Sequence, residues 1–188
     1  MAGPSADEVA DRALVLYALA RRAAIELTLE GFEYHPERIQ QAEVARSETQ
    51  RWLARESLTQ ALTDTERTLL GAAAGAWPRE AVIDGLWRKE SFGVLLWALQ
   101  HIPALPGIDE EFEVEVLDAR IAAYGSVSAF RANGLLRPEG EIERARQEAD
   151  AWLAATEGRD GQDATLASIS AERVRALSWL RDRDAAPA

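Results

Sequence analysis

The sequence predicts an all-α protein: one domain of six to eight helices around a central buried helix at about residues 79–102. Apolar residues recur at helical spacing along most of the chain, and capping patterns, prolines and glycines mark where the segments begin and end. The length of 188 residues suits a single domain. Hydrophobic residues make up 47% and charged residues 28%, which is ordinary for a folded globular protein.

The first two helices are predicted from their start and stop signals. Ser5 and Glu8 form a capping-box pattern, in which each side chain bonds the other's backbone N–H. The apolar face behind it is expected to run through Ala24 and Leu27, on to a stop at residue 31. A second helix is expected to open at Pro36, because proline suits the first helical turn.

The middle of the chain predicts two further helices. Thr63 and Glu66 repeat the capping-box pattern ahead of an apolar face. That face consists of Leu69, Leu70, Ala73, Ala74 and Trp77. The segment 78–102 follows and is ended by Pro103, and its residues 91–99 are apolar almost all round. A helix that is apolar on every side is typical of a buried, central position.

The acidic segment after the central helix is compatible with two structures. Phe112, Val114 and Val116 alternate with polar residues, as in a strand. Phe112 and Val116 also share helical spacing with Ile121 and Tyr124. Helix is favoured, because an isolated strand would have no partner.

The C-terminal part predicts two more helices. Pro138 opens the first, and residues 157–163 are expected to form a polar loop. Ser170 is expected to cap the last helix, which would end near Arg183, leaving residues 184–188 as a frayed tail.

The net charge of the chain limits the kinds of molecule that it is expected to bind. The chain has 21 basic and 32 acidic residues, a formal charge of -11. Acidic surfaces are repelled by DNA, RNA and anionic membranes, so neither nucleic acid nor membrane is an expected partner. Another protein with a basic surface is the expected one. Twenty arginines against one lysine suggest a GC-rich bacterial genome, and the absence of a signal-like N-terminus predicts a cytoplasmic protein.

The sequence lacks the residues that several common kinds of catalytic and binding site require. There is no cysteine, no glycine-rich phosphate loop and no G-x-S-x-G pattern. The two histidines are isolated, so neither a metal site nor a cofactor is predicted. His101 is expected at the C-terminal end of the central helix, where the helix dipole favours it.

One polar cluster is expected in the core. Glu90 falls on an apolar stripe of the central helix, and Arg173 projects between leucines of the last helix. A buried carboxylate is costly unless it is paired or protonated. Two explanations are open: a tryptophan-walled pocket with Glu90 as a ligand-binding or acid–base group, and an internal Glu90–Arg173 ion pair that joins two helices. The candidate residues are Trp87, Arg88, Glu90, Trp97, Glu172, Arg173 and Trp179.

A second candidate is the run of acids after the central helix, namely Asp109, Glu110, Glu111, Glu113 and Glu115. Clustered charge can steer a basic partner towards its binding surface. The alternative is a solvated acidic first turn of a helix, kept for solubility.

The chain resembles the domain of unknown function 4272 family over about residues 12–183. The matching segments are WRKESFGVLLWALQ at 87–100, LRPEGEI at 136–142, a helix with Trp152 and SAERVRALSWL at 170–180. Ser178 stands where the family usually has asparagine. The resemblance implies a helical fold and brings no activity, substrate or catalytic residue.

The sequence therefore predicts a non-enzymatic protein-binding module. The alternative is an enzyme or small-molecule binder that uses the pocket around Glu90 and Arg173. A homodimer is expected if an apolar helical face stays uncovered in the monomer.

Overall fold

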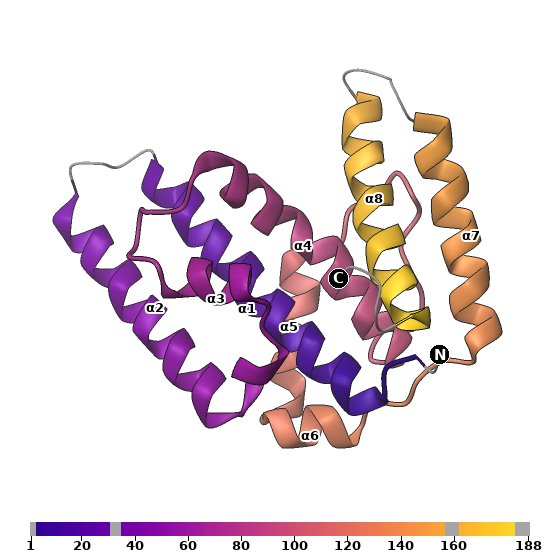
Figure 1. Ribbon diagram of the computed structural model, residues 1–188, viewed down its shortest axis with the longest axis horizontal. Helices are drawn as coiled ribbons and strands as arrows, with labels where there is room; N and C mark the ends of the chain where they lie inside the picture. The colour runs from indigo at the N-terminus through magenta and orange to yellow at the C-terminus, as the bar shows by residue number, and fades with distance from the viewer. Residues whose placement is uncertain (1–2, 31–34, 157–161, 183–188) are drawn as a thin grey trace. The chain divides into compact units, whose positions relative to one another are not determined.

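The computed structural model describes residues 3–30, 35–156 and 162–182, with side chains from residue 165 onward in the last range. These residues form eight α-helices and one 3₁₀ helix, and no strand occurs among them (Figure 1). The predicted all-α fold is therefore confirmed.

The chain divides into two compact units. Residues 14–88 form one, called here the early unit, and residues 1–13 with 89–188 form the other, the late unit. Helices α1 (Ala6–Glu30) and α4 (Arg79–Ala98) each contribute residues to both units. That the whole chain folds as one domain stays a prediction.

Helix α1 begins as predicted. Ser5 N donates to Glu8 Oε2 at 2.8 Å, and Glu8 N donates to Ser5 Oγ at 3.3 Å, which completes the capping box. The predicted apolar face is wrong at its C-terminal end, because Ala24 and Leu27 are exposed. The predicted stop at residue 31 lies outside the described residues.

Helix α2 (Pro36–Arg55) begins at the predicted proline. The 3₁₀ helix η1 (Leu58–Ala61) was not predicted from the sequence. Helix α3 (Asp64–Gly71) has the predicted capping box, since the Thr63 side chain accepts from Glu66 N and Glu66 returns a bond to the Thr63 backbone.

The expected continuation of α3 to Trp77 is wrong. The helix ends at Gly71, and Ala73, Ala74 and Trp77 lie in the loop that precedes α4. Side chains of α1 and α2 bind the backbone of this loop, as described below. Gly75 has a φ of 80° there, a left-handed conformation that glycine adopts without strain.

Helix α4 ends at Ala98, four residues before the predicted end. Gln100 adopts a φ of 61°, His101 N bonds the carbonyl of Leu96, and Gln100 N bonds that of Trp97. This pair of bonds is the Schellman arrangement that closes helices, here with glutamine in the place of the usual glycine. Residues 90–99 are all buried, as predicted for the centre of the fold.

The acidic segment leads into two short helices. Helix α5 (Val114–Tyr124) settles the choice between strand and helix in favour of helix. Helix α6 (Val127–Ala132) was not predicted, although Ser126 caps it by accepting from Ala129 N at 3.1 Å.

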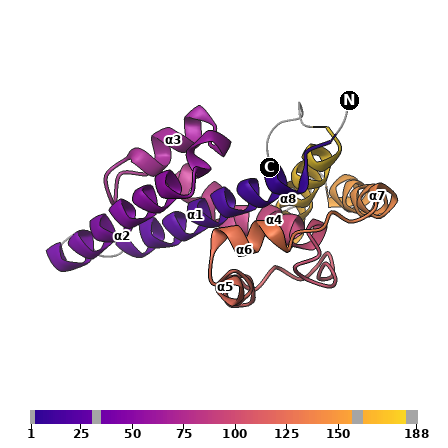
Figure 2. The ribbon, with the colours of Figure 1, turned by 90° about the horizontal axis from the view of Figure 1, so that it is seen from below.

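Helices α7 (Glu139–Thr156) and α8 (Gln162–Arg181) pack side by side as an antiparallel pair (Figures 1 and 2). The predicted cap at Ser170 is wrong: this serine is buried inside α8. The helix begins at Gln162, and Ile169, directly before this serine, shares a buried face with Ala176 and Leu177. The predicted loop at 157–163 is wrong at its end, because residues 162 and 163 lie in the first turn of α8. Residues 157–161 and the predicted tail lie outside the described residues.

Candidate functional site

The polar cluster of the late unit is built on a buried ion pair between α4 and α8. The exposed fraction is 0% for Glu90 and 3% for Arg173. Arg173 Nε donates to Glu90 Oε2 at 3.0 Å, and Arg173 Nη2 lies 2.9 Å from the same oxygen. The contact with an arginine that the sequence predicts for Glu90 is therefore present, in a charge-assisted geometry.

The other donors of Arg173 bind the loop between α4 and α5. Its Nη1 donates to the carbonyl oxygens of Pro106 at 3.2 Å and Gly107 at 3.1 Å, and its Nη2 donates to that of Glu110 at 2.7 Å. With Glu90 included, the guanidinium donates four hydrogen bonds, three of them to carbonyl oxygens of this loop. Arg173 therefore fastens this loop to α8.

Glu90 also binds the loop between α4 and α5. Phe112 N donates to Glu90 Oε1 at 2.8 Å, and the Phe112 ring lies 5.3 Å from the Arg173 guanidinium carbon. The ring also packs on Gly93, where an added Cβ would lie 2.4 Å from it. Burial raises the pKa of Glu90, and the Phe112 N–H and the charge of Arg173 oppose that rise.

A second polar link joins the same two helices. Ser91 Oγ lies 2.7 Å from Glu172 Oε2 and 3.0 Å from the Glu172 carbonyl oxygen, and both can accept its hydrogen. Arg175, one turn away, forms an ion pair with the Glu172 carboxylate. Both charged residues predicted in α8 thus contact the buried part of α4.

The remaining predicted cluster residues have other roles. Trp97 is buried, and Arg137 lies over its ring at 4.8 Å and donates to its carbonyl oxygen at 2.8 Å. Trp179 is buried in α8. Trp87 and Arg88 are half-buried and belong to the early unit.

The predicted acidic segment begins on the α4–α5 loop that Arg173 and Glu90 bind, and it extends into the first turn of α5. Asp109, Glu110, Glu111, Glu113 and Glu115 are all exposed. Glu115 alone of the five lies in the first turn of α5, so the solvated-first-turn explanation describes only part of the segment. Two valines beside these acids are also exposed, Val114 by 43% and Val116 by 46%.

The early unit holds a second buried ion pair, which was not predicted from the sequence. Arg22 and Glu26 of α1 are 3% and 2% exposed, and Arg22 Nε donates to Glu26 Oε1 at 2.7 Å. Arg22 Nη2 also donates to the carbonyl oxygens of Ala72 at 3.1 Å and Ala73 at 2.8 Å. This arginine therefore fixes the loop after α3.

Two carboxylates hold the same loop by its N–H groups. Glu26 accepts from Gly75 N at 3.1 Å and from Trp77 N at 3.3 Å, and Glu43 of α2 accepts from Ala74 N at 2.5 Å. The Ala74 bond is the main cause that lowers the pKa of Glu43. The sequence does contain a signal for this pair, because Arg22 and Glu26 have the i, i+4 spacing of helical ion pairs. The predicted apolar face through Ala24 and Leu27 placed both residues on the solvent side of the helix, so the buried pair was missed.

No group of three or more His, Cys, Asp or Glu side chains suited to a metal ion occurs in residues 3–30, 35–156 and 162–182. Across these ranges, every helix is too short or too polar to cross a bilayer.

Comparison with known proteins identifies the family alone. No curated protein and no solved structure matches the chain. The family model described as "Domain of unknown function (DUF4272)" matches residues 1–186, which is nearly the whole chain. The chain therefore belongs to the DUF4272 family, as its resemblance in the tryptophan-containing helices predicted.

Proposed function

We propose that this chain is a protein-binding module that receives a basic partner on its acidic segment, residues 109–115. The observation that carries the proposal is the attachment of this segment to a buried ion pair. Arg173 binds the carbonyl oxygen of Glu110, and Glu90 binds the N–H of Phe112, so the backbone between the exposed carboxylates is fixed. A surface that is ordered before binding loses less conformational entropy when the partner arrives.

The partner's chemistry follows from the surface. Five carboxylates, of which Glu111 is already paired with Lys89, favour lysine or arginine side chains and raise the association rate at low salt. The exposed Val114 and Val116 add apolar area beside them. We therefore propose a partner whose basic residues surround a small apolar contact, in the cytoplasm, with nucleic acids and membranes excluded by charge. A homodimer stays a separate prediction.

The alternative, an enzyme or small-molecule binder that uses Glu90 and Arg173, has less support. Neither side chain is accessible to a ligand, with exposed fractions of 0% and 3%. Arg173 already donates four hydrogen bonds to protein acceptors, and its Nη2 also lies within ion-pair distance of Glu90. Burial and these bonds favour a structural role for the pair.

The test uses two variants with the same change in charge. The first carries Asp109→Asn with Glu110, Glu111, Glu113 and Glu115 each changed to Gln. The control variant neutralises five exposed acids elsewhere, namely Glu37, Glu48, Glu80, Asp84 and Glu139. Both variants and the unchanged protein are used to capture partners from lysate at low and high salt, and captured proteins are identified by mass spectrometry.

We expect a basic protein to be captured by the unchanged chain and by the control variant, and to be lost from the first variant and at high salt. Equal capture by all three proteins, independent of salt, would overturn the proposal. Loss from both variants would show that net charge alone attracts the partner, and it would remove the specific role of the segment.

A further inference from the structure

A cluster of three rings joins the end of α4 to the short helices α5 and α6. The ring of His101, which follows α4, lies 4.7 Å from that of Tyr124 and 4.5 Å from that of Phe130. The rings of Tyr124 and Phe130 meet edge to face at 5.5 Å. Tyr124 is the last residue of α5 and Phe130 lies in α6, so His101 contacts both helices.

The imidazole of His101 has a hydrogen-bond partner on one side only. Its Nδ1 lies 2.7 Å from the Tyr124 hydroxyl, whereas its Nε2 is buried without a partner among the described residues. Gly134 closes this second side, because a Cβ added there would lie 3.7 Å from Nε2 and 3.0 Å from a methyl group of Leu99. A neutral ring fits this place, but a protonated ring would bury a positive charge with a single hydrogen bond.

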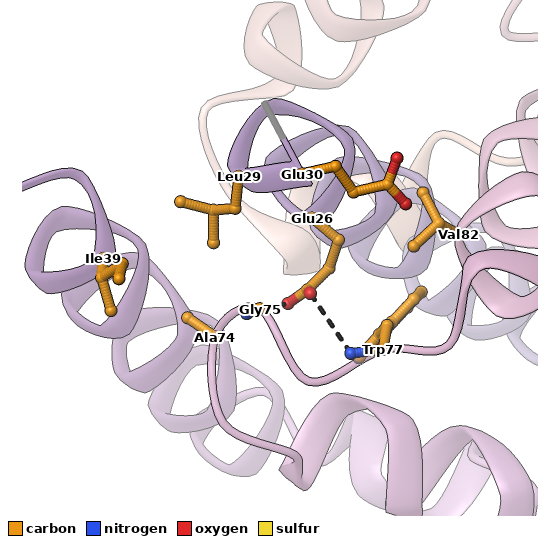
Figure 3. Close-up of a pocket in the computed structure, with 8 residues that line it drawn as sticks. All are labelled: Glu26, Leu29, Glu30, Ile39, Ala74, Gly75, Trp77 and Val82. Carbon is orange, nitrogen blue, oxygen red and sulfur yellow. Dashed lines mark hydrogen bonds between the residues drawn. The ribbon is translucent and has the colours of Figure 1, made fainter. Parts of the chain in front are cut away.

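The buried carboxylates of this protein are bound from several sides. Glu26 of the early unit accepts from Arg22 and from two N–H groups of the loop before α4, and Figure 3 shows its carboxylate turned towards that loop. Glu90 is likewise bonded at both oxygens. Their charged forms are therefore compensated, whereas for His101 the charged form is the one that lacks compensation.

The surroundings of His101 contribute no charge to it among the described residues. Leu99 and Gly134 offer a side chain and backbone without charge, α5 offers the Tyr124 hydroxyl, and α6 offers the ring and carbonyl group of Phe130. Burial lowers the pKa of His101, and the Phe130 carbonyl group opposes that shift only in part. The ring therefore takes up a proton more readily when it reaches water.

Helix α5 has few buried side chains to hold it in place. Within Val114–Tyr124, all of which the structure describes, Leu117 is the only buried residue and Tyr124 is half-buried. Asp118 Oδ1 is a buried atom without a hydrogen-bond partner among the described residues. Parts of a fold with little buried apolar surface open at a lower free energy than the whole molecule.

We infer that protonation of His101 opens the α5–α6 part of the late unit, so that these two helices leave the end of α4 while α7 and α8 keep their structure. The open form hydrates the ring, and it is therefore the form that binds the proton as the pH falls. Mild acid would then expose Leu117 and Phe130, which are buried at neutral pH.

Hydrogen–deuterium exchange of the full chain at about pH 7.5 and about pH 5.5 tests this inference. The data are expressed as protection factors, which remove the intrinsic dependence of exchange on pH. A hydrated histidine has a pKa of 6.5, so one pH unit below that value the open form gains up to about tenfold. Amides of α5 and α6 should lose protection by up to about that factor, and amides of α7 should keep theirs.

Three variants identify the group that titrates. His101→Gln should abolish the pH dependence, because glutamine does not bind a proton in this range. His35→Gln removes the other histidine of the chain, and Asp118→Asn removes the carboxylate of α5; both should behave as the unchanged protein does. Glu90 is kept in every variant, so an effect of its protonation on the α4–α5 loop would persist in His101→Gln.

Equal protection of α5 and α6 at the two pH values would overturn the inference, and this result needs only the unchanged protein. A loss of protection spread equally over α7 would also overturn it, since that pattern indicates global unfolding. So would a pH dependence that persists in His101→Gln. The outcome is independent of the proposed function, because exchange is measured without a partner.

Discussion

Glu90 is buried without exposed surface, yet it is hydrogen-bonded at both carboxylate oxygens. Glu90→Leu should lower the free energy of unfolding by about 3–5 kcal/mol, because it leaves the Arg173 charge buried and unpaired. Urea denaturation measures this change. As a control, Glu80→Leu at an exposed position should stay within about 0.5 kcal/mol of the unchanged protein. If Glu90→Leu unfolds at the same urea concentration as the unchanged protein, the pair is not stabilising.

His101 should make the stability depend on pH. Its exposed fraction is 6%, Nδ1 lies 2.7 Å from the Tyr124 hydroxyl, and its ring is 4.5 Å from that of Phe130. Burial lowers the pKa of His101 below its ordinary value of 6.5, so the helix dipole expected from the sequence does not dominate.

Since the folded pKa of His101 is the lower one, the unfolded chain binds the proton first as the pH falls. Stability should therefore be complete above about pH 6.5 and should fall as the pH drops from there towards the folded pKa. The check compares the unchanged protein with His101→Gln by urea denaturation at about pH 7.5 and about pH 5.5. An identical difference between the two pH values in both proteins would contradict the prediction.

The two buried ion pairs show what the sequence could predict at this scale. Glu90 and Arg173 were both identifiable, because each interrupts an otherwise apolar helical stripe. Arg22 and Glu26 were not, because alanines and leucines around α1 allow more than one apolar face. The loop contacts of either pair join residues far apart in the chain, and no local pattern records them.

At the scale of elements, the packing of the α4–α5 loop on α4 depends on Gly93. An added Cβ would lie 2.4 Å from the Phe112 ring, so Gly93→Ala must displace that ring. We expect a loss of about 1–3 kcal/mol, the usual cost of overpacking. Gly140→Ala in α7 has open space around it and should gain about 0.5–1 kcal/mol from helix propensity. Thermal unfolding of both variants tests this, and equal melting temperatures would contradict it.

Helix starts were predictable and helix ends were less so. Capping boxes and proline fix the starts of α1, α2 and α3 through residues that are adjacent in the chain. The end of α3 depends instead on Arg22, about 50 residues away, which binds the carbonyl oxygens of Ala72 and Ala73. The start of α8 was placed too late because a polar serine in a buried position imitates a cap.

At the scale of the molecule, the shared helices should make unfolding cooperative. Both α1 and α4 run from one compact unit into the other, so unfolding one unit removes part of a helix from its neighbour. We expect a single transition in urea, with coincident curves from circular dichroism and tryptophan fluorescence. Each unit contains three of the six tryptophans, so fluorescence reports on both. Two separate transitions would contradict the prediction of one domain.

The hydrogen bond from Phe112 N to Glu90 should also slow the exchange of the Phe112 amide hydrogen with solvent. Amide hydrogens in irregular segments usually exchange with solvent through small local openings of the chain. The Phe112 amide is instead bonded to a carboxylate that is fully buried. Its deuterium uptake should match that of the buried half of α4, and Glu90→Leu should accelerate it far more than it accelerates amides of α7. An irregular stretch of chain would then be among the last parts of the late unit to exchange its amide hydrogens.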